Sequence, residues 1–388
     1  MDKNNILILC KVVDNYGDIG VVYRLAKALS RLRPELNLAI VVSNLDSFKS
    51  LCPAVNPSQK TQTISFGKNT WRIVDWNIHD AGAAGFDVGK YPIILECFQC
   101  GRPQWLEDVL FSDDFTGTAH IVNIDYLTAE EYADDFHLLK SGTRKTTIKK
   151  INFMPGFTKN TGSLILEKNQ PEKQPREKKT FDVLIFSYER DFLPIVNALK
   201  DFGEKKRLQG DFCVRTLVAA GKSAGPFRAA WESCQKPFCA QFLDFLPQEE
   251  WDALLEQADF LFVRGEDSLS RACLSGIPFV WHAYVQEDEY QLVKVNALLE
   301  RMRPFFCEED FSIVALSWRT YNTSVPTGEE KTALENNIAL MLDRRSIRKS
   351  FAAFSASLFH NGDMAEHLLS YIDTISMSAD NAPCAVNK

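Results

Sequence analysis

Two carboxylates stand four residues apart in the segment DNYGD, where Asp14 and Asp18 lie on either side of Gly17. The glycine lets the backbone turn sharply. One carboxylate could act as a general base while the second orients it or holds an incoming cation. The structural alternative is that Asp18 caps a helix, with Asp14 and Asn15 as ordinary turn residues. The segment departs from GxGxxG and from the phosphate-binding loop, which disfavours a dinucleotide or nucleoside-triphosphate site.

A second group of reactive side chains lies in FVRGEDSLSRAC, residues 262–273, where an apolar run leads into a helix that should stop at Gly276. The free N–H groups of a helix start, the Ser268 hydroxyl and the Arg264 guanidinium would together suit a diphosphate. Acids beside them could contact sugar hydroxyls. Alternatively, Asp267 or Ser268 simply caps the helix and Arg264 pairs with an acid.

The third group is aromatic. FSYE, residues 186–189, ends an apolar run, and FLDFLPQ, residues 242–248, precedes a helix whose start is marked by Pro247. Aromatic faces at strand ends can sandwich a nucleobase. Because the chain has 27 phenylalanines, ordinary core packing is the competing explanation.

The first group must be positioned by a strand and a helix. Residues 6–9 form a continuous apolar run, typical of a strand covered on both faces of a parallel sheet. Apolar residues then recur at helical spacing over residues 18–32, with Arg24 and Lys27 between them, which predicts an amphipathic helix. Further strands are expected at 38–42, 93–95 and 121–124. This alternation predicts a doubly wound α/β domain.

A charged, proline-containing stretch at 158–180 predicts a linker, and the apolar runs restart after it at 183–186, 214–218, 260–263 and 279–281. We therefore expect two Rossmann-like α/β domains facing each other across a cleft. Ligands of such sheets bind at the carboxyl ends of the strands. The predicted domains are residues 1–157 and 181–376, followed by a flexible tail at 377–388.

The composition of the chain limits the classes of molecule that the protein is expected to bind. The net charge of −7 argues against nucleic acid, and no apolar stretch approaches the length that spans a bilayer. Ten scattered cysteines and an N-terminus without a signal peptide favour the cytoplasm. Cys97 and Cys100 form a lone CxxC, which indicates two thiols and not a metal site. The six histidines form no metal-binding pattern, and only His282 lies close to one of the groups described above.

The motifs together carry a specific resemblance. DNYGDIGVVYRLAKAL, FSYE, FLPQ, and FVRGEDSLSRA with GIPFVWHAY are similar to the EarP family of bacterial protein-arginine rhamnosyltransferases, over essentially the whole chain. The resemblance implies a GT-B fold and an inverting transferase that moves rhamnose from dTDP-β-L-rhamnose to one arginine of elongation factor P. It also implies that no metal ion or other cofactor is needed.

Carried over residue by residue, the resemblance makes three acids catalytic and places the acceptor side near the first motif. The implied catalytic residues are Asp14, Asp18 and Glu266. The implied donor-binding residues are Phe186, Tyr188, Phe245, Leu246, Gln248, Arg264, Asp267 and Ser268. Asn15 and Tyr16 are expected on the acceptor side. Asp18 is the preferred base, although the sequence does not decide between it and Asp14. The rival functions are a GT-B transferase with a lipid or glycan acceptor and a non-catalytic sugar-nucleotide-binding protein.

Overall fold

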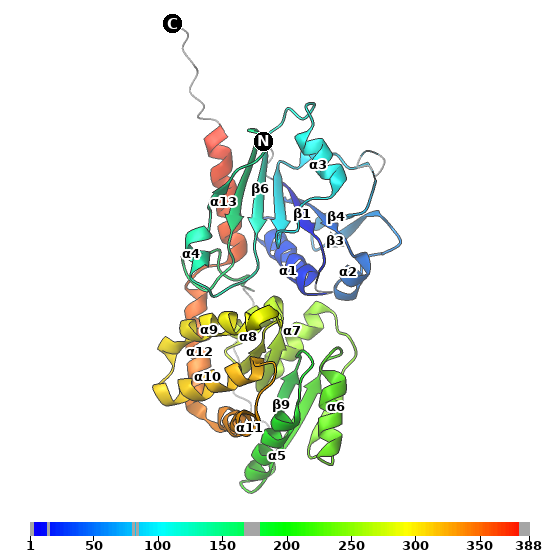
Figure 1. Cartoon of the computed structure of the whole chain (residues 1–388). Coiled ribbons are helices and arrows are strands. Elements are labelled where there is room, and N and C mark those ends of the chain that lie inside the picture. Colours follow the sequence, from blue (N-terminus) through cyan, green and yellow to red (C-terminus); the bar gives the residue numbers. More distant parts are fainter. Residues whose placement is uncertain (1–3, 14–15, 80–81, 83–84, 167–178, 380–388) are drawn as a thin grey trace. The chain divides into compact units, whose positions relative to one another are not determined.

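The computed structural model describes residues 4–13, 16–79, 82, 85–166 and 179–379 (Figure 1). The chain divides into two compact units, one formed by Met1–Glu167 with Asn361–Lys388 and the other by Lys168–His360. Each unit is a mainly parallel sheet with helices, so the predicted α/β class is confirmed. No helix in these ranges is long and apolar enough to cross a membrane.

The first unit is built on an eight-stranded sheet in the order β3-β4-β2-β1-β5-β6-β8-β7. Only β3 and β7 pair antiparallel with their neighbours. Its strands are β1 (Asn5–Cys10), β2 (Asn37–Val42), β3 (Thr61–Phe66), β4 (Asn69–Asp75), β5 (Ile93–Cys97), β6 (Ala119–Ile124), β7 (Lys140–Ser141) and β8 (Ile148–Phe153). Its helices are α1 (Gly17–Leu32), α2 (Leu45–Leu51), α3 (Gln104–Phe111), α4 (Tyr132–Phe136) and α13 (Met364–Ala379), with a 3-10 turn η1 (Val88–Lys90).

Both faces of this sheet are covered, which explains the continuous apolar runs of its central strands. Ile6 and Ile8 of β1 pack into a core with α1, α2 and α13, whereas Leu7 and Leu9 pack into a second core with α3. The predicted amphipathic helix is present as α1, but its polar face is not solvated. Arg24 and Lys27 are buried, and the Lys27 ammonium lies 4.3 Å from the centroid of the Tyr23 ring.

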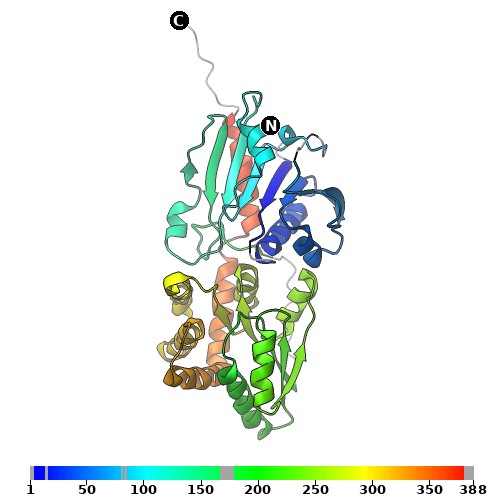
Figure 2. The same cartoon turned by 45° about the vertical axis from the view of Figure 1, so that its right-hand side comes forward.

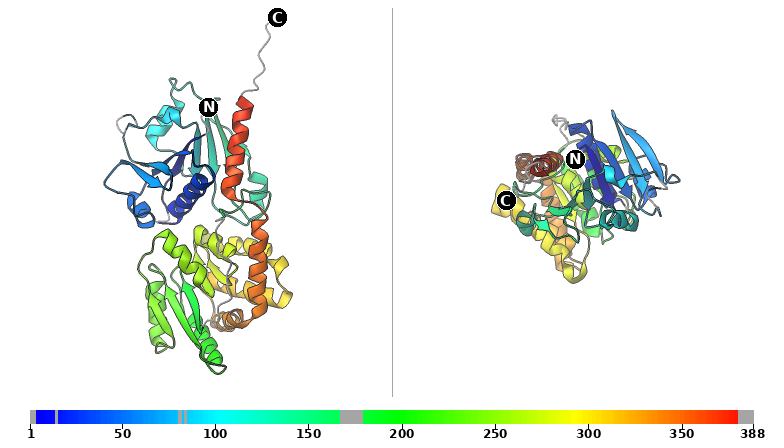
Figure 3. Two further views of the ribbon diagram at one scale, coloured as in Figure 1. Left: turned by 180° about the vertical axis from the view of Figure 1, so that it is seen from behind. Right: turned by 90° about the horizontal axis from the view of Figure 1, so that it is seen from above.

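The C-terminal helix corrects the predicted domain boundaries. Residues 361–376 were assigned to the second domain by sequence, but α13 packs with α1 on one face of the first sheet (Figures 1 and 3). Leu368 and Ile372 are buried in the core that also holds β1. Arg33, just after α1, donates a hydrogen bond of 2.7 Å to Asp373. Apolar packing and this ion pair join the two ends of the chain. The helix also runs to Ala379, three residues into the predicted tail.

The predicted linker begins too early. Ser163 and Leu164 are buried in the first unit, and the Ser163 hydroxyl donates a hydrogen bond of 2.9 Å to the carbonyl of Asn361. The Leu166 N–H donates to the Asp363 carboxylate at 2.6 Å. Residues 158–166 therefore belong to the first unit and bind the segment at the start of α13. The charged part of the predicted linker, residues 167–178, lies outside the described residues.

The second unit contains a five-stranded, wholly parallel sheet in the order β11-β10-β9-β12-β13. Its strands are β9 (Thr180–Ile185), β10 (Cys213–Val218), β11 (Cys239–Phe242), β12 (Phe260–Arg264) and β13 (Phe279–His282). Its helices are α5 (Leu193–Arg207), α6 (Ala224–Ser233), α7 (Gln248–Gln257), α8 (Glu266–Ser275), α9 (Gln291–Met302), α10 (Glu308–Asn322), α11 (Gly328–Asp343) and α12 (Arg345–Phe359). Two 3-10 turns, η2 (Glu287–Glu289) and η3 (Arg303–Phe305), complete it.

In each sheet there is one position at which successive crossover connections run toward opposite edges of the sheet. In the first sheet β1 lies between β2 and β5, and in the second β9 lies between β10 and β12. Figure 2 shows the same chain turned by 45°, with β1 in dark blue. At such switch points the connections leave in opposite directions, which opens the carboxyl ends of the two strands to a ligand. DNYGD follows β1, and RGEDS begins at the last residue of β12. Both motifs therefore stand at switch points.

The packing of α13 makes a stability prediction. Leu368→Ala should lower the free energy of unfolding by about 2–5 kcal/mol, because it leaves a cavity in a fully buried site of the first core. Urea unfolding with hydrogen exchange read over each unit would measure this. The loss should appear in the amides of β1 and α1. Leu208→Ala, at a strongly exposed position, is the control. A loss confined to β9 and β12 would contradict the assignment of α13.

Candidate active site

The first candidate site lies at the carboxyl ends of β1 and β5. Asp18 is the second residue of α1, and only 4% of it is exposed. The Val13 N–H donates to its Oδ2 at 2.7 Å, and the Tyr126 hydroxyl donates to its Oδ1 at 3.4 Å. A carboxylate in the first turn of a helix is also favoured by the helix dipole. These contacts hold the Asp18 carboxylate in one orientation.

Asp18 is not the cap of α1. The N-cap position is Tyr16, which makes no side-chain cap hydrogen bond, and Asp18 instead accepts a hydrogen bond from Val13, which precedes the helix. The capping alternative considered from sequence therefore does not describe this carboxylate. Tyr16 is exposed. Asp14 and Asn15 lie outside the described residues, so their predicted roles stay predictions.

Three thiols surround the same strand ends. Cys10 and Cys97 are buried, and Cys100 is partly buried. Burial raises the pKa of all three thiols, that of Cys100 to about 12, and the Asp18 charge raises those of Cys10 and Cys97 further. Protonated thiols are poor nucleophiles and poor metal ligands. Among the described residues, no three His, Cys, Asp or Glu side chains are grouped so that they could hold a metal ion.

Tyr126 belongs to this site, although the sequence analysis missed it. Its ring stacks on Phe98, with centroids 4.7 Å apart and an interplanar angle of 25°. Phe98 and Gln99 have left-handed backbone conformations, with φ of 60° and 51°. The Gln99 amide donates to Asp125 at 2.8 Å. The signal was available, because Asp125 and Tyr126 directly follow the predicted strand 121–124 at the same edge of the sheet.

The second candidate site lies at the carboxyl ends of β9 and β12. The Arg264 guanidinium carbon is 4.8 Å from the Phe186 ring centroid and 4.6 Å from that of Tyr188. Its buried Nε has no hydrogen-bond partner among the described residues. A buried N–H without a partner costs about 1–3 kcal/mol, so an anion that supplies an acceptor here would be bound favourably. The structure thus brings together three of the predicted donor residues.

The helix that follows Arg264 starts at a glycine. Gly265 is the N-cap of α8 with φ 71° and ψ 165°, a conformation that side chains rarely adopt. Asp267 and Ser268 are not in the cap position but in the first turn, after Glu266. The capping alternative is therefore not what these residues do. The Asp267 carboxylate and the Ser268 hydroxyl therefore stand in the first turn of α8, where the positive end of the helix dipole favours an anion.

The remaining predicted donor residues follow β11 at the same edge of the sheet. Phe245 is exposed, Leu246 is partly buried, and Gln248 is buried at the start of α7. Trp251 of α7 packs edge-on against Phe186, with ring centroids 4.9 Å apart. This contact fixes α7 beside the end of β9. The sequence left two explanations for these aromatic residues, a nucleobase site and core packing. Tyr188 is buried, as a core residue is, whereas Phe245 is open to solvent, as a ligand-binding residue can be.

A network of buried polar side chains lies next to Tyr188. The Ser187 hydroxyl lies 2.8 Å from His282 Nδ1 and 2.9 Å from the Tyr321 hydroxyl. Burial, and next the charges of Arg190 and Arg264, lower the pKa of His282 to about 3. The imidazole is therefore neutral at physiological pH. His282 therefore takes part in this network as a neutral imidazole.

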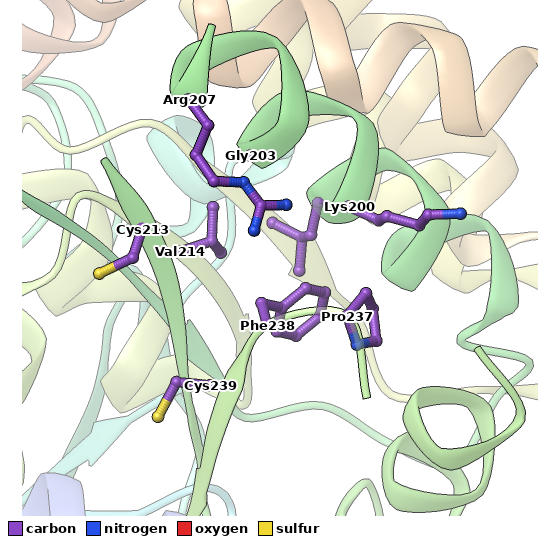
Figure 4. A pocket seen from close by; sticks show the side chains of 9 residues that line it. Lys200, Gly203, Arg207, Cys213, Val214, Pro237, Phe238 and Cys239 are labelled. Atoms are coloured by element: carbon purple, nitrogen blue, oxygen red, sulfur yellow. The ribbon is translucent and has the colours of Figure 1, made fainter. Parts of the chain in front are cut away.

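A surface pocket of the second unit lies elsewhere. Figure 4 shows its lining, in which Lys200 and Arg207 come from α5, and Val214, Pro237 and Phe238 lie below that helix. Cys213 and Cys239, also in the lining, are the first residues of β10 and β11. The pocket is therefore at the amino ends of the strands, opposite the candidate site, and none of the predicted site residues lines it.

The comparisons with known proteins decide the family. A family profile described as "Elongation-Factor P (EF-P) rhamnosyltransferase EarP" matches residues 6–373. The chain belongs to this family. A protein-arginine rhamnosyltransferase of Shewanella oneidensis is 32% identical over 359 residues, covering 83% of this chain and 86% of the relative. One from Neisseria meningitidis is 27% identical over 402 residues, covering 94% and 96%.

Solved structures agree on the fold. A structure of an EarP that mediates arginine glycosylation of translation elongation factor EF-P aligns with a TM-score of 0.55 and 19% identity, covering 95% of this chain and 99% of that one. An anthocyanidin 3-O-glucosyltransferase in complex with UDP aligns with a TM-score of 0.53 and 10% identity, covering 97% and 99%. The GT-B class and the family resemblance predicted from sequence are confirmed. The protein is a glycosyltransferase.

The Tyr126 contact makes a kinetic prediction. With Asp18 as the predicted base, Tyr126→Phe should lower kcat for sugar transfer about fivefold, because it removes a hydrogen bond worth about 1 kcal/mol to that carboxylate. KM for both substrates and the melting temperature should stay unchanged. Tyr91→Phe is the matched control, since Tyr91 stacks on Phe86 in the same unit. Equal kcat values for the two variants would show that the Tyr126 hydroxyl does not act on Asp18.

The neutral state of His282 makes a pH prediction. Its folded pKa of about 3 lies below the unfolded value of about 6.5, so its contribution to stability is complete above pH 6.5 and is lost as the pH falls toward 3. When the pH is lowered from 6.5 to 5, the free energy of unfolding should fall in both proteins. The fall should be about 1.5 kcal/mol smaller for His282→Gln than for the wild type. Urea unfolding at each pH measures this, with the exposed His360→Gln as the control. Parallel pH curves for wild type and His282→Gln would be inconsistent with a neutral His282.

Proposed function

We propose that this enzyme moves L-rhamnose from dTDP-β-L-rhamnose to an arginine side chain of elongation factor P, with inversion at the anomeric carbon. The observation that carries the proposal is that the two motifs of this family member stand at the two switch points. One supplies the buried carboxylate of Asp18, and the other supplies the guanidinium of Arg264. The names of the matching family and of the relatives support the choice of sugar and acceptor.

The acceptor chemistry requires a fixed carboxylate. An arginine has a pKa above about 12, and its nitrogen lone pairs are delocalised over the guanidinium, so it is a poor nucleophile. In this proposal Asp18, oriented by Val13 and Tyr126, accepts a proton from one guanidinium nitrogen as that nitrogen attacks the anomeric carbon. Asp14 holds the guanidinium through a charge-assisted hydrogen bond, and Asn15 and Tyr16 stand on the acceptor side.

The donor chemistry requires positive charge at the leaving group. The bond from the anomeric carbon to the diphosphate oxygen breaks as the new carbon–nitrogen bond forms, and dTDP departs with the electron pair. Arg264, Ser268 and the start of α8 are assigned to the diphosphate. In this proposal they supply the charge stabilisation that some transferases take from a metal ion. Attack from the face opposite the diphosphate converts the β-linked sugar to an α-linked product.

The nucleoside is assigned to the aromatic side of the same site. Phe186, Tyr188 and Phe245 contact the thymine, and Leu246 and Gln248 contribute mainly backbone contacts to the base. Asp267 is assigned to the ribose, and Glu266 is the third acid required for activity. Its position at the start of α8 supports a contact with sugar hydroxyls. The proposed setting is the cytoplasm, since translation factors work there and ten cysteines suit a reducing compartment.

Mass spectrometry of elongation factor P after incubation with the protein and dTDP-β-L-rhamnose tests the proposal. A mass increase of one deoxyhexose on a single arginine is the expected result, and NMR of the product should report an α linkage. An unchanged mass, with dTDP-rhamnose still bound, would favour a sugar-nucleotide-binding protein. Transfer to a lipid or glycan instead would identify another acceptor.

Two substitutions should separate the two halves of the chemistry. Asp18→Asn should lower kcat at least about 100-fold, because it removes the base, and leave dTDP affinity intact. Arg264→Met should weaken dTDP binding about 10-fold or more, because it removes a charge-assisted hydrogen bond to phosphate. Calorimetry with dTDP and initial rates measure both effects. Asp46→Asn, an exposed aspartate in the first turn of α2, is the control. Near-normal transfer by Asp18→Asn would refute its role as base.

A further inference from the structure

The pocket at the amino ends of β10 and β11 has room for a small organic group (Figure 4). Its volume is about 180 Å³. Apolar cavities of about 150 Å³ bind benzene, so this space takes a group of about one aromatic ring. The apolar part of its lining consists of Leu199 and Val214, which are buried, and of Pro237 and Phe238, which are partly buried. The pocket therefore suits the apolar body of a small molecule.

A glycine inside α5 leaves the pocket open. Glycine is an unfavourable residue in a helix interior, so its presence there calls for a reason. A Cβ at Gly203 would lie 3.2 Å from Val214 Cγ2, which is closer than side chains normally pack. The helix therefore lies close to β10 at this point. Because Gly203 has no side chain, nothing at this position of α5 covers the apolar lining.

Arg207 stands one helical turn after Gly203 on the same face of α5. Side chains in a helix lean toward its N-terminus. Figure 4 shows the Arg207 side chain running back toward Gly203, with its guanidinium at the pocket, whereas the Lys200 ammonium points away. A guanidinium binds a carboxylate or a phosphate through two parallel hydrogen bonds. Arg207 therefore places an anion-binding group beside the apolar lining.

The charge of Arg207 is not used within the second unit. In the described part of the chain, its side chain takes part in no hydrogen bond or ion pair. The two preceding cations differ, because Lys205 and Lys206 both pair with Asp343, at 2.7 and 2.6 Å. Ligand sites combine an apolar lining with a few polar groups that fix the orientation of the ligand. This pocket has both parts.

The segment that carries Pro237 and Phe238 is held in a strained conformation. Gln235 and Lys236 have left-handed backbone, with φ of 59° and 55°. Such conformations cost free energy and persist only where the surroundings impose them. Trp231 does so here, because its carbonyl accepts the Lys236 N–H at 2.9 Å and its ring N–H donates to the Phe238 carbonyl at 3.0 Å. This side of the pocket is therefore formed before a ligand binds, which lowers the entropy lost on binding.

We propose that this pocket binds a small organic anion, a carboxylate or phosphate attached to an apolar group of about one ring. Arg207 binds the anionic group, and Val214 and Phe238 contact the apolar group. The pocket lies at the amino ends of its strands, whereas the candidate site for the sugar nucleotide lies at the carboxyl ends of β9 and β12. The inference therefore goes beyond the proposed function and does not depend on it.

Isothermal titration calorimetry with benzoate and phenyl phosphate as probes tests the pocket. Benzyl alcohol and inorganic phosphate are the reference probes, because the first has only the ring and the second only the charge. At least one of the two organic anions should bind about 10-fold or more tightly than both references. The tighter of the two identifies the anionic group. If neither binds more tightly than the references, the proposal is wrong.

Substitutions of the lining locate the bound probe. Arg207→Gln changes an exposed side chain, so it should leave the melting temperature unchanged and weaken binding of the organic anion about 10-fold or more. Phe238→Ala should weaken the organic anion but not inorganic phosphate, because it removes only an apolar contact. Arg345→Gln, at an exposed position at the start of α12, is the charge-matched control. Equal affinities in Arg207→Gln and Arg345→Gln would refute the site.

A further variant separates this pocket from the sugar-nucleotide site, which could also take an aromatic phosphate. Arg264→Met should bind the organic anion as the wild type does. If Arg264→Met loses the probe while Arg207→Gln keeps it, the probe occupies the candidate active site and the pocket proposal is wrong. If the probe binds at Arg207 but elongation factor P is not modified, the proposed function alone fails.

Discussion

The parallel pairing of β1 with β5, and of β9 with β12, is the constraint on which both candidate sites depend. A parallel neighbour obliges each connection to return along the outside of the sheet. Where two successive connections leave toward opposite edges, nothing covers the strand ends between them. Backbone N–H groups, helix starts and short loops gather there. The reactive side chains of this chain occupy those two openings, and the rest of each unit keeps the strands aligned.

The two openings have opposite electrostatic character. At the first, a carboxylate whose charge acts on the buried Cys10 and Cys97 thiols receives hydrogen bonds from a backbone amide and a tyrosine. At the second, a guanidinium lies between two aromatic rings, with a helix start beside it. Each charge is held by hydrogen bonds or ring contacts with groups of its own unit. Preorganised groups of this kind need little rearrangement when a substrate arrives, which is where most electrostatic catalysis originates.

The sequence predicted what depends on local pattern. Continuous apolar runs located the central strands, and helical spacing located α1 and the end of α8 at Gly276, which adopts the left-handed conformation of a helix terminus. The motifs were found from residue types and spacing, whereas the family and the roles assigned to the motif residues came from resemblance. Long-range packing was not predictable in this way. Nothing in the local pattern of α13 says that it joins β1, and nothing near Ser163 says that it binds Asn361. Tyr126 was missed because its contact to Asp18 spans 108 residues.

The return of α13 to the first core has a consequence for synthesis of the chain. The first unit is made first but lacks a helix of its core until residues 361–379 have been translated. The second unit is in effect inserted into it, and at about 5–20 residues per second its translation takes roughly 10–40 s. During that interval the face of the sheet that carries Ile6 and Ile8 is incompletely covered. The nascent first unit therefore exposes apolar surface of the kind that chaperones bind, and a chain terminated within α12 would lack the helix that completes its earliest-made core.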